Sequence, residues 1–119
     1  MDIQHLKAEL THHRMEWNEL GSHFDKTEEK ILDYIRAGEI DSTIKYFETL
    51  RDIENKMRPL RNNLIFVYEN LAQIAQLKGK YSEENDFKEK AEHFYKSRYY
   101  RNERSLKLIG LLNRNGIMV

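Results

Sequence analysis

The chain has 119 residues, which is enough for one domain with a single core. It contains no cysteine, and this excludes disulfides, thiolate zinc sites and cysteine nucleophiles. Twenty basic residues balance twenty acidic ones, which argues against a protein whose main function is to bind nucleic acid. No apolar run approaches the ~20 residues that a membrane-spanning helix needs, so we expect a soluble cytoplasmic protein without a membrane contact.

The first element in chain order is an amphipathic helix over residues 1–24, because apolar residues from Ile3 onward recur at spacings of three and four. Gly21 weakens the end of this helix. Asp25-Lys26-Thr27-Glu28 then has the spacing of a capping box, so we expect a second helix to begin there. The apolar spacing also continues through Ile31, and a single helix over residues 2–36 is the alternative.

Two glycines end helical patterns in the same way. Gly38 and Gly79 each lie just past the last periodic residue, where positive φ is common and costs other residues strain. An apolar residue follows two positions after each glycine, and then Asp41 or Ser82 is placed to cap the next helix. This shared sequence pattern predicts two helical hairpins, with turns 41 residues apart.

Pro59 kinks the third helix or begins the next one, because proline lacks the N–H that a helix interior requires. The segment after it is the most apolar in the chain and is therefore expected to be central. Its apolar positions are Leu60, Leu64, Val67, Tyr68, Leu71, Ile74, Ala75 and Leu77. We expect one domain over residues 1–119: an N-terminal helix (1–24), a first hairpin (25–57), a second hairpin (60–112), with a bend at Gly110, and a frayed tail (113–119).

Residues 68–95 resemble a tetratricopeptide repeat. The matching positions are Tyr68, Leu71, Ala72, Gly79, Tyr81 and Ala91. Glu84 and Lys88 depart from the pattern, since a small and an aromatic residue are expected there, and residues 31–50 look like a poorer second copy. The 41-residue spacing exceeds the usual 34 of this class. The resemblance implies an all-α fold of about five helices in stacked antiparallel hairpins, either tetratricopeptide-like or a compact bundle.

Residues 31–57 also resemble the hairpin of small flagellar export chaperones, which are helical bundles of about this size that hold an export cargo. The residues that carry this likeness are Gly38-Glu39-Ile40-Asp41, followed by a long amphipathic helix. Both resemblances imply binding of a partner's helix or extended peptide.

In tetratricopeptide-like hairpins the first helix of each pair lines the concave face. If Tyr68 and Leu71 pack inward, the candidates for residues near a partner groove are Glu69, Asn70, Gln73 and Gln76. Asparagine and glutamine there would bond both the donors and the acceptors of a partner's backbone. The alternative is that these four residues form the solvated side of an amphipathic helix, and that an aromatic residue such as Trp17 or Tyr100 anchors the partner instead.

Basic and aromatic residues alternate near the C-terminus. Residues 96–119 contain six basic residues and one acidic residue, a net charge of +5, so residues 1–95 carry −5. The candidates for a basic patch are Arg98, Tyr100, Arg101 and Arg104. Such side chains bind phosphates and stack on bases, which gives nucleic-acid binding as an alternative function. The competing interpretations are a solvated helix, contact with the acidic remainder of the chain, or an acidic protein partner.

Metal binding and catalysis receive little support from the sequence. Glu9 and His13, and likewise His12 and Glu16, lie four residues apart, a spacing that is common by chance in a chain with 20 acidic residues. No His-Glu-x-x-His spacing, glycine-rich phosphate loop or nucleophile elbow occurs. We therefore expect no metal site, no cofactor and no enzymatic activity.

The sequence thus predicts a non-enzymatic protein-interaction module, such as an adaptor, a chaperone or a regulator. It would bind a partner peptide or helix through a helical groove or face. A small export chaperone and a nucleic-acid-binding regulator are the alternatives. Terminal helical repeats need a capping face, so dimerisation that covers exposed ends is a further hypothesis.

Overall fold

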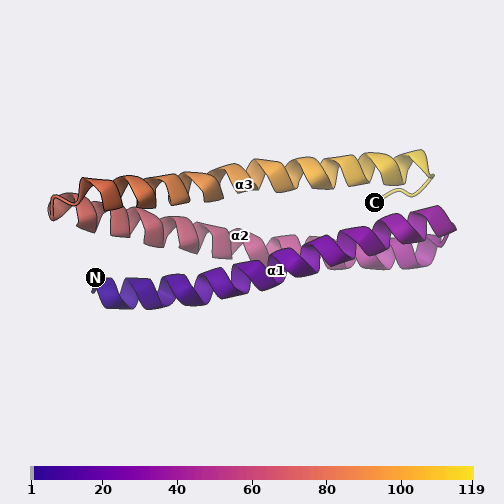
Figure 1. Cartoon of the computed structure of the whole chain (residues 1–119). Helices are drawn as coiled ribbons and strands as arrows, with labels where there is room; N and C mark the ends of the chain where they lie inside the picture. The colour runs from indigo at the N-terminus through magenta and orange to yellow at the C-terminus, as the bar shows by residue number, and fades with distance from the viewer. Residues whose placement is uncertain (1) are drawn as a thin grey trace.

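The computed structural model describes residues 2–119, apart from the side chains of residues 98–102. Within these residues the chain forms three long helices and no strand: α1 (Ile3–Ala37), α2 (Ile40–Leu77) and α3 (Tyr81–Arg114). They run up, down and up again, and α2 packs along both of the others (Figure 1). The bundle measures 59 × 21 × 17 Å. The expected all-α class is confirmed, with fewer and longer helices than the five expected.

The break expected near residues 21–25 does not occur, because α1 continues through Gly21 and the proposed capping box. Thr27, which belongs to that box, is buried in the middle of the helix, and its hydroxyl donates to the carbonyl of His23 at 2.7 Å. Phe24 and Ile31, one turn on either side, are fully buried. Their burial holds the helix together across a sequence that locally resembles a helix start.

Pro59 lies inside α2, so of the two alternatives at this proline the start of a new helix is wrong. A proline in a helix leaves the carbonyl four residues earlier without its usual donor. Here that carbonyl belongs to Asn55, and both Asn55 and Pro59 are exposed. Water can therefore solvate the carbonyl, and packing of the opposite side of α2 keeps the helix continuous.

The turns at Gly38 and Gly79 are confirmed. Gly38 has φ = 72° and Gly79 has φ = 70°, both in the left-handed region. After Gly38, the Glu39 N–H donates to the carbonyl of Tyr34 at 3.0 Å, and after Gly79 the Lys80 N–H donates to that of Ala75 at 2.9 Å. Each of these bonds joins residues five positions apart, as in a Schellman motif. Such a motif satisfies carbonyls that a helix end leaves unpaired.

The expected caps at Asp41 and Ser82 are wrong. The cap positions lie two residues earlier than expected, so Asp41 and Ser82 are within the first turns of α2 and α3. Glu39 and Lys80 occupy the cap positions, and neither uses its side chain to cap. Each of them is the single residue between the glycine of the turn and the next helix.

The C-terminal tail is not frayed. Gly116 has φ = 78°, and the Ile117 N–H donates to the carbonyl of Leu112 at 2.9 Å, which makes a third turn of the Schellman type. This turn directs Ile117 back onto the bundle, where it is buried in the same cluster as Leu108 and Leu112. Burial of one apolar side chain therefore orders the chain beyond the end of α3.

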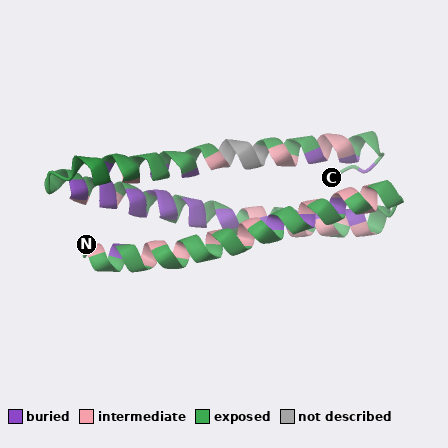
Figure 2. Ribbon diagram, viewed as in Figure 1, coloured by how far each residue is buried: buried purple, intermediate pink, exposed green. Residues whose placement is uncertain are grey.

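The core runs along α2, which has the most buried residues of the three helices (Figure 2). Near the Gly38 turn, all three helices contribute to one cluster that includes Phe24, Phe47 and Leu112. Near the Gly79 turn, Leu6 of α1 meets Val67 and Leu71 of α2. The expectation that the segment after Pro59 is central is therefore confirmed. In the described part of the chain, no helix is both long enough and apolar enough to cross a membrane.

Candidate functional site

The side of α2 that faces away from α1 and α3 carries a line of five residues, of which four are exposed and Asn70 is half-buried. Its members are Asn62, Phe66, Asn70, Gln73 and Leu77. Their spacings of four, four, three and four residues place them on one side of the helix, opposite the buried side chains of the same segment. Phe66 is 53% exposed and Leu77 is 80% exposed. We call these five residues the α2 outer face.

Charge is nearly absent from this part of α2. Among the sixteen residues 62–77, only Glu69 is charged, whereas the chain average of 34% would give five or six. Surfaces of soluble proteins ordinarily carry charged residues at about that average frequency. Depletion of charge combined with exposed aromatic and aliphatic residues is instead typical of the centre of a protein–protein interface.

Glu69 is held at the edge of this face. The Tyr95 hydroxyl of α3 donates to Glu69 Oε1 at 3.1 Å. This hydrogen bond, together with the charge of Glu69, raises the pKa of Tyr95 above its ordinary value. Because Tyr95 reaches over from α3, the carboxylate of Glu69 is drawn toward the α2–α3 seam and away from the line of Phe66 and Gln73.

The four candidate partner-binding residues therefore lie together, on an outward helix surface. Asn70 and Gln73 belong to the α2 outer face, while Glu69 and Gln76 lie along its edge toward α3. The Asn70 amide donates through Nδ2 to the carbonyl of Phe66 at 2.8 Å, so its Oδ1 is available as an acceptor. Gln73 and Gln76 are exposed. Their role in binding stays a prediction.

Sequence reasoning missed the two apolar members of the face. Leu77 was expected in the core, and Phe66 was not singled out. A signal existed, because Phe66 falls out of step with Leu64, Val67 and Leu71, whose spacings of three and four mark the buried side. An aromatic residue opposite a well-defined apolar stripe is a candidate for contact with something outside the fold.

Arg104, one member of the expected basic patch, is bound within the chain. Its guanidinium Nη2 lies 2.9 Å from Asp25 Oδ1 and 2.7 Å from Glu28 Oε1, and it stands 4.6 Å from the ring centre of Phe24. Burial alone would lower the pKa of Arg104, but Glu28 and Asp25 outweigh it and raise that pKa. We call these four residues the Arg104 cluster. The cluster joins α3 to α1. Arg104 therefore fits the interpretation that basic residues near the C-terminus contact the acidic remainder of the chain.

The other three members of that patch, Arg98, Tyr100 and Arg101, have side chains outside the described residues. Trp17, considered above as a partner anchor, packs inside the bundle instead. Its ring meets Phe94 edge to face with 5.3 Å between ring centres, and the Arg61 guanidinium lies 5.7 Å from its centre. Trp17 therefore contributes to the core.

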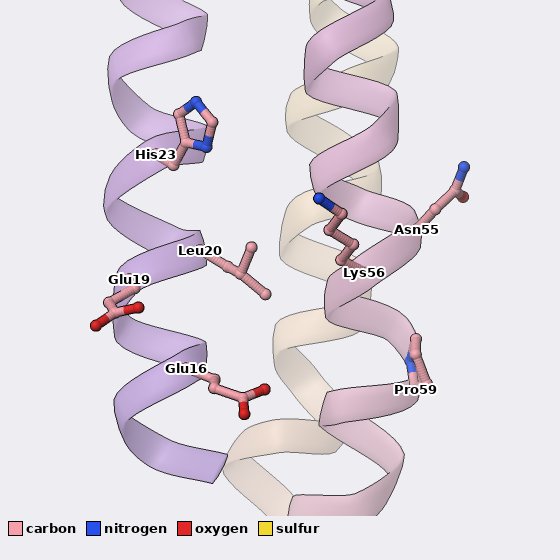
Figure 3. Close-up of a pocket in the computed structure, with 7 residues that line it drawn as sticks. All are labelled: Glu16, Glu19, Leu20, His23, Asn55, Lys56 and Pro59. Atoms are coloured by element: carbon pink, nitrogen blue, oxygen red, sulfur yellow. The ribbon is translucent and has the colours of Figure 1, made fainter. Parts of the chain in front are cut away.

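A shallow groove of about 660 Å³ lies between α1 and α2 (Figure 3). Its lining residues are Glu16, Glu19, Leu20, His23, Asn55, Lys56 and Pro59. Leu20 points between the helices, whereas Asn55 and Pro59 point away from α1. Five of the seven lining residues have polar side chains, and all except Leu20 are exposed. Since Pro59 precedes Phe66 by two helical turns on the same side of α2, this groove continues the α2 outer face toward α1.

The histidines form exposed pairs on α1 without a third ligand. His5 Nε2 lies 3.1 Å from Glu9, and His12 Nε2 lies 2.6 Å from Glu16. Glu9 and His13, whose spacing is the same, do not pair: Glu9 pairs with His5, and His13 is half-buried with no hydrogen-bond partner for its Nδ1. Among the residues that the structure describes, no group of three histidine or carboxylate side chains is placed to hold a metal ion.

Comparison of the chain with models of protein families, with curated proteins and with solved structures finds no match. A function for this protein therefore has to be argued from its own residues. The strongest feature for such an argument is the α2 outer face, since Arg104 and Trp17 have partners within the fold and the other side chains of the basic patch lie outside the described residues.

Proposed function

We propose that this protein is a non-enzymatic interaction module of the cytoplasm that binds a helix of a protein partner along the α2 outer face. One observation carries the proposal: two large apolar side chains, Phe66 and Leu77, are exposed within sixteen residues that contain a single charge. Such a helix surface makes few strong interactions with water, so covering it with a partner has a low desolvation cost.

Burial against a partner explains both properties. Full burial of a large apolar side chain contributes on the order of 2 kcal/mol relative to exposure, so Phe66 and Leu77 would supply most of the binding free energy. Charges near them would have to be desolvated, and that cost often exceeds the attraction gained. Amide side chains such as Asn70 and Gln73 instead offer both donors and acceptors, which fix the register of a bound helix.

Helix length favours one form of such a module over another. A tetratricopeptide repeat fits two helices into about 34 residues, whereas α1, α2 and α3 have 35, 38 and 34 residues each. A bundle of long helices offers a straight outer surface in place of a concave groove. It accords better with the resemblance to export chaperones, and we propose adaptor or cargo-chaperone activity of that kind.

The proposal is tested with a photo-cross-linking residue, p-benzoylphenylalanine, at position 73 of the full chain in its source cells. We expect an adduct with a specific protein, which mass spectrometry identifies. The same residue in place of Asp86, an exposed position of α3, is the matched control. Equal labelling from the two positions, or none, would contradict the proposal.

A binding measurement with the purified partner completes the test. Calorimetric titration should show that Phe66→Lys weakens binding at least tenfold, while Asp86→Lys leaves binding unchanged. Circular dichroism should show that both variants keep the helical content of the natural chain. A partner that binds the Phe66→Lys variant with full affinity uses another surface, and the α2 outer face would then be the wrong assignment.

A further inference from the structure

We infer that the partner helix is α2 of a second copy of this chain, and that two copies pair antiparallel through their outer faces about a two-fold axis. This inference rests on the proposed function and names the occupant of the same surface. It is carried by the symmetry of the face, by its lack of charge and by the chemistry of its five side chains.

Four of the five residues of the face, all except Asn62, are spaced symmetrically about a common centre. Asn70 and Gln73 lie equally far from a point midway between them, and Phe66 and Leu77 also lie equally far from that point on either side. Antiparallel pairing about this point sets Phe66 of each copy opposite Leu77 of the other. It also sets Asn70 opposite Gln73. Every contact then occurs twice, as a two-fold interface requires.

The side chains that meet in this arrangement are alike. The apolar Phe66 covers the apolar Leu77, and each is largely exposed in the single chain. At the centre, the amides of Asn70 and Gln73 each carry donors and an acceptor, so that the two can bond one another. With Asn70 Nδ2 already donating to the Phe66 carbonyl, its Oδ1 is left to accept from the Gln73 amide of the second copy. A polar pair at the centre would fix the register.

Identity of the two partners also explains the missing charge. Near a two-fold axis each side chain lies close to its own counterpart, and like charges that face one another are destabilising. The face therefore has to be free of net charge, which an unrelated partner of opposite charge would not require. The one charge in the segment, Glu69, is held toward α3 by the Tyr95 hydroxyl at 3.1 Å.

The size of the face sets the expected strength. Residues 66–77, which pair with one another in this arrangement, span about 16 Å along the helix, and this gives a small interface by the standards of stable dimers. The exposed Pro59 and the groove beside it extend the contact toward α1. We therefore expect a reversible dimer with a dissociation constant on the order of micromolar.

Sedimentation equilibrium of the purified full chain tests the association. The natural chain should approach twice the 14.4 kDa mass of one copy as its concentration rises. Phe66→Lys and, independently, Leu77→Lys should each raise the dissociation constant at least tenfold without loss of helical circular dichroism. Asp86→Lys, on the exposed side of α3, should leave the dissociation constant unchanged.

Disulfide trapping tests the antiparallel register, and the chain suits it because it has no cysteine. Phe66→Cys and Leu77→Cys chains are prepared separately, mixed and oxidised mildly. The mixed pair should form a disulfide at least tenfold faster than either variant alone, because residue 66 of one copy lies opposite residue 77 of the other, whereas the two residues 66 lie about 16 Å apart along the helices. Asp86→Cys, alone or mixed with either, should cross-link slowly.

Each outcome decides between the inference and the proposed function. A natural chain that stays at 14.4 kDa at millimolar concentration overturns the dimer. If position 73 then cross-links a different protein in cells, the proposed function stands without the dimer. If it cross-links nothing, both fail. A dimer that Phe66→Lys does not weaken, or a Phe66→Cys chain that cross-links fastest with itself, overturns the α2 interface or its antiparallel register.

Discussion

The Arg104 cluster and the α2 outer face both lie on the surface of the bundle, and they differ in how their charges are arranged. At the Arg104 cluster, one cation of α3 meets two carboxylates of α1, and its guanidinium lies on the ring of Phe24. On the α2 outer face, Glu69, which is the one carboxylate of residues 62–77, is held at the edge by a tyrosine. The charges of the first region are paired within the chain, whereas the second region exposes the apolar side chains of Phe66 and Leu77.

The difference indicates which surface stabilises the fold and which awaits a partner. The charged pairs of the Arg104 cluster join α1 to α3, two helices that contact one another far less than each of them contacts α2. An uncharged surface with exposed phenylalanine and leucine adds nothing to the stability of a single chain. Substitutions in the Arg104 cluster should therefore change the free energy of unfolding, whereas substitutions in the α2 outer face should change association.

The largest expected effect compares the two sides of α2 itself. Leu71→Ala should lower the free energy of unfolding by about 3 kcal/mol, because Leu71 is 1% exposed and its removal leaves a cavity against Leu6 and Val67. Phe66→Ala should change that free energy by less than about 0.5 kcal/mol under monomeric conditions. Urea denaturation followed by circular dichroism measures both. A large loss for Phe66→Ala would assign this residue to the fold and remove the basis for a binding face.

The next effect concerns the Arg104 cluster. Arg104→Met should lower the free energy of unfolding by about 2 kcal/mol, because it removes charge-assisted hydrogen bonds and leaves Glu28 partly buried without its partner. The side chain of Arg104 is 21% exposed and that of Asp25 is 60% exposed, so most of the loss should come from Glu28. Lys107→Met, at an exposed position three residues on, is the matched control and should be nearly neutral. Equal urea midpoints for the two variants would show that the cluster contributes nothing.

A smaller effect concerns the turn at Gly79, which follows Leu77, the last residue of the α2 outer face. Gly79→Ala should cost about 1–2 kcal/mol of unfolding free energy, because φ = 70° strains any side chain while nothing lies within 4 Å of the added methyl group. Gly110→Ala should instead stabilise the helix by up to about 1 kcal/mol, since Gly110 lies inside α3 with equally open space. Thermal unfolding of the two variants should therefore shift in opposite directions. A shift of the same sign would show that the strain argument is wrong.

The helical class, the two turns and the central place of the segment after Pro59 could all be predicted, because they depend on local chemistry and periodicity. Glycine at positions 38 and 79 is needed for a left-handed residue, and no distant contact is required to see it. Gly116 followed by Ile117 gives the same signal, which sequence reasoning did not apply to the tail. The local rule was sound at all three sites.

The continuity of the helices and the Arg104 cluster could not be predicted in the same way. Asp25 and Glu28 look like helix-start residues in isolation, and their partner Arg104 is 79 and 76 positions away in the chain. Pro59 looks like a helix boundary unless the exposure of its surroundings is known. In each case packing between helices outweighs the local preference for a helix boundary, and a single sequence does not show that packing.

The smallest effect bears directly on why the α2 outer face is free of charge. The hydrogen bond to Glu69 raises the pKa of Tyr95 above 10, so any stabilisation from this bond is complete below pH 10 and disappears as the pH rises through the pKa of the folded chain. Glu69→Gln should bring the pKa of Tyr95 down toward 10. Titration of the labelled tyrosine rings by carbon NMR measures this change. Tyr34, whose pKa is raised by Tyr46, should keep its value and serves as the internal control. A Tyr95 pKa that does not move would mean that Glu69 is not tied to α3. Its carboxylate would then be free to lie over Phe66 and Gln73, and a two-fold pairing through that surface would set two negative charges near one another.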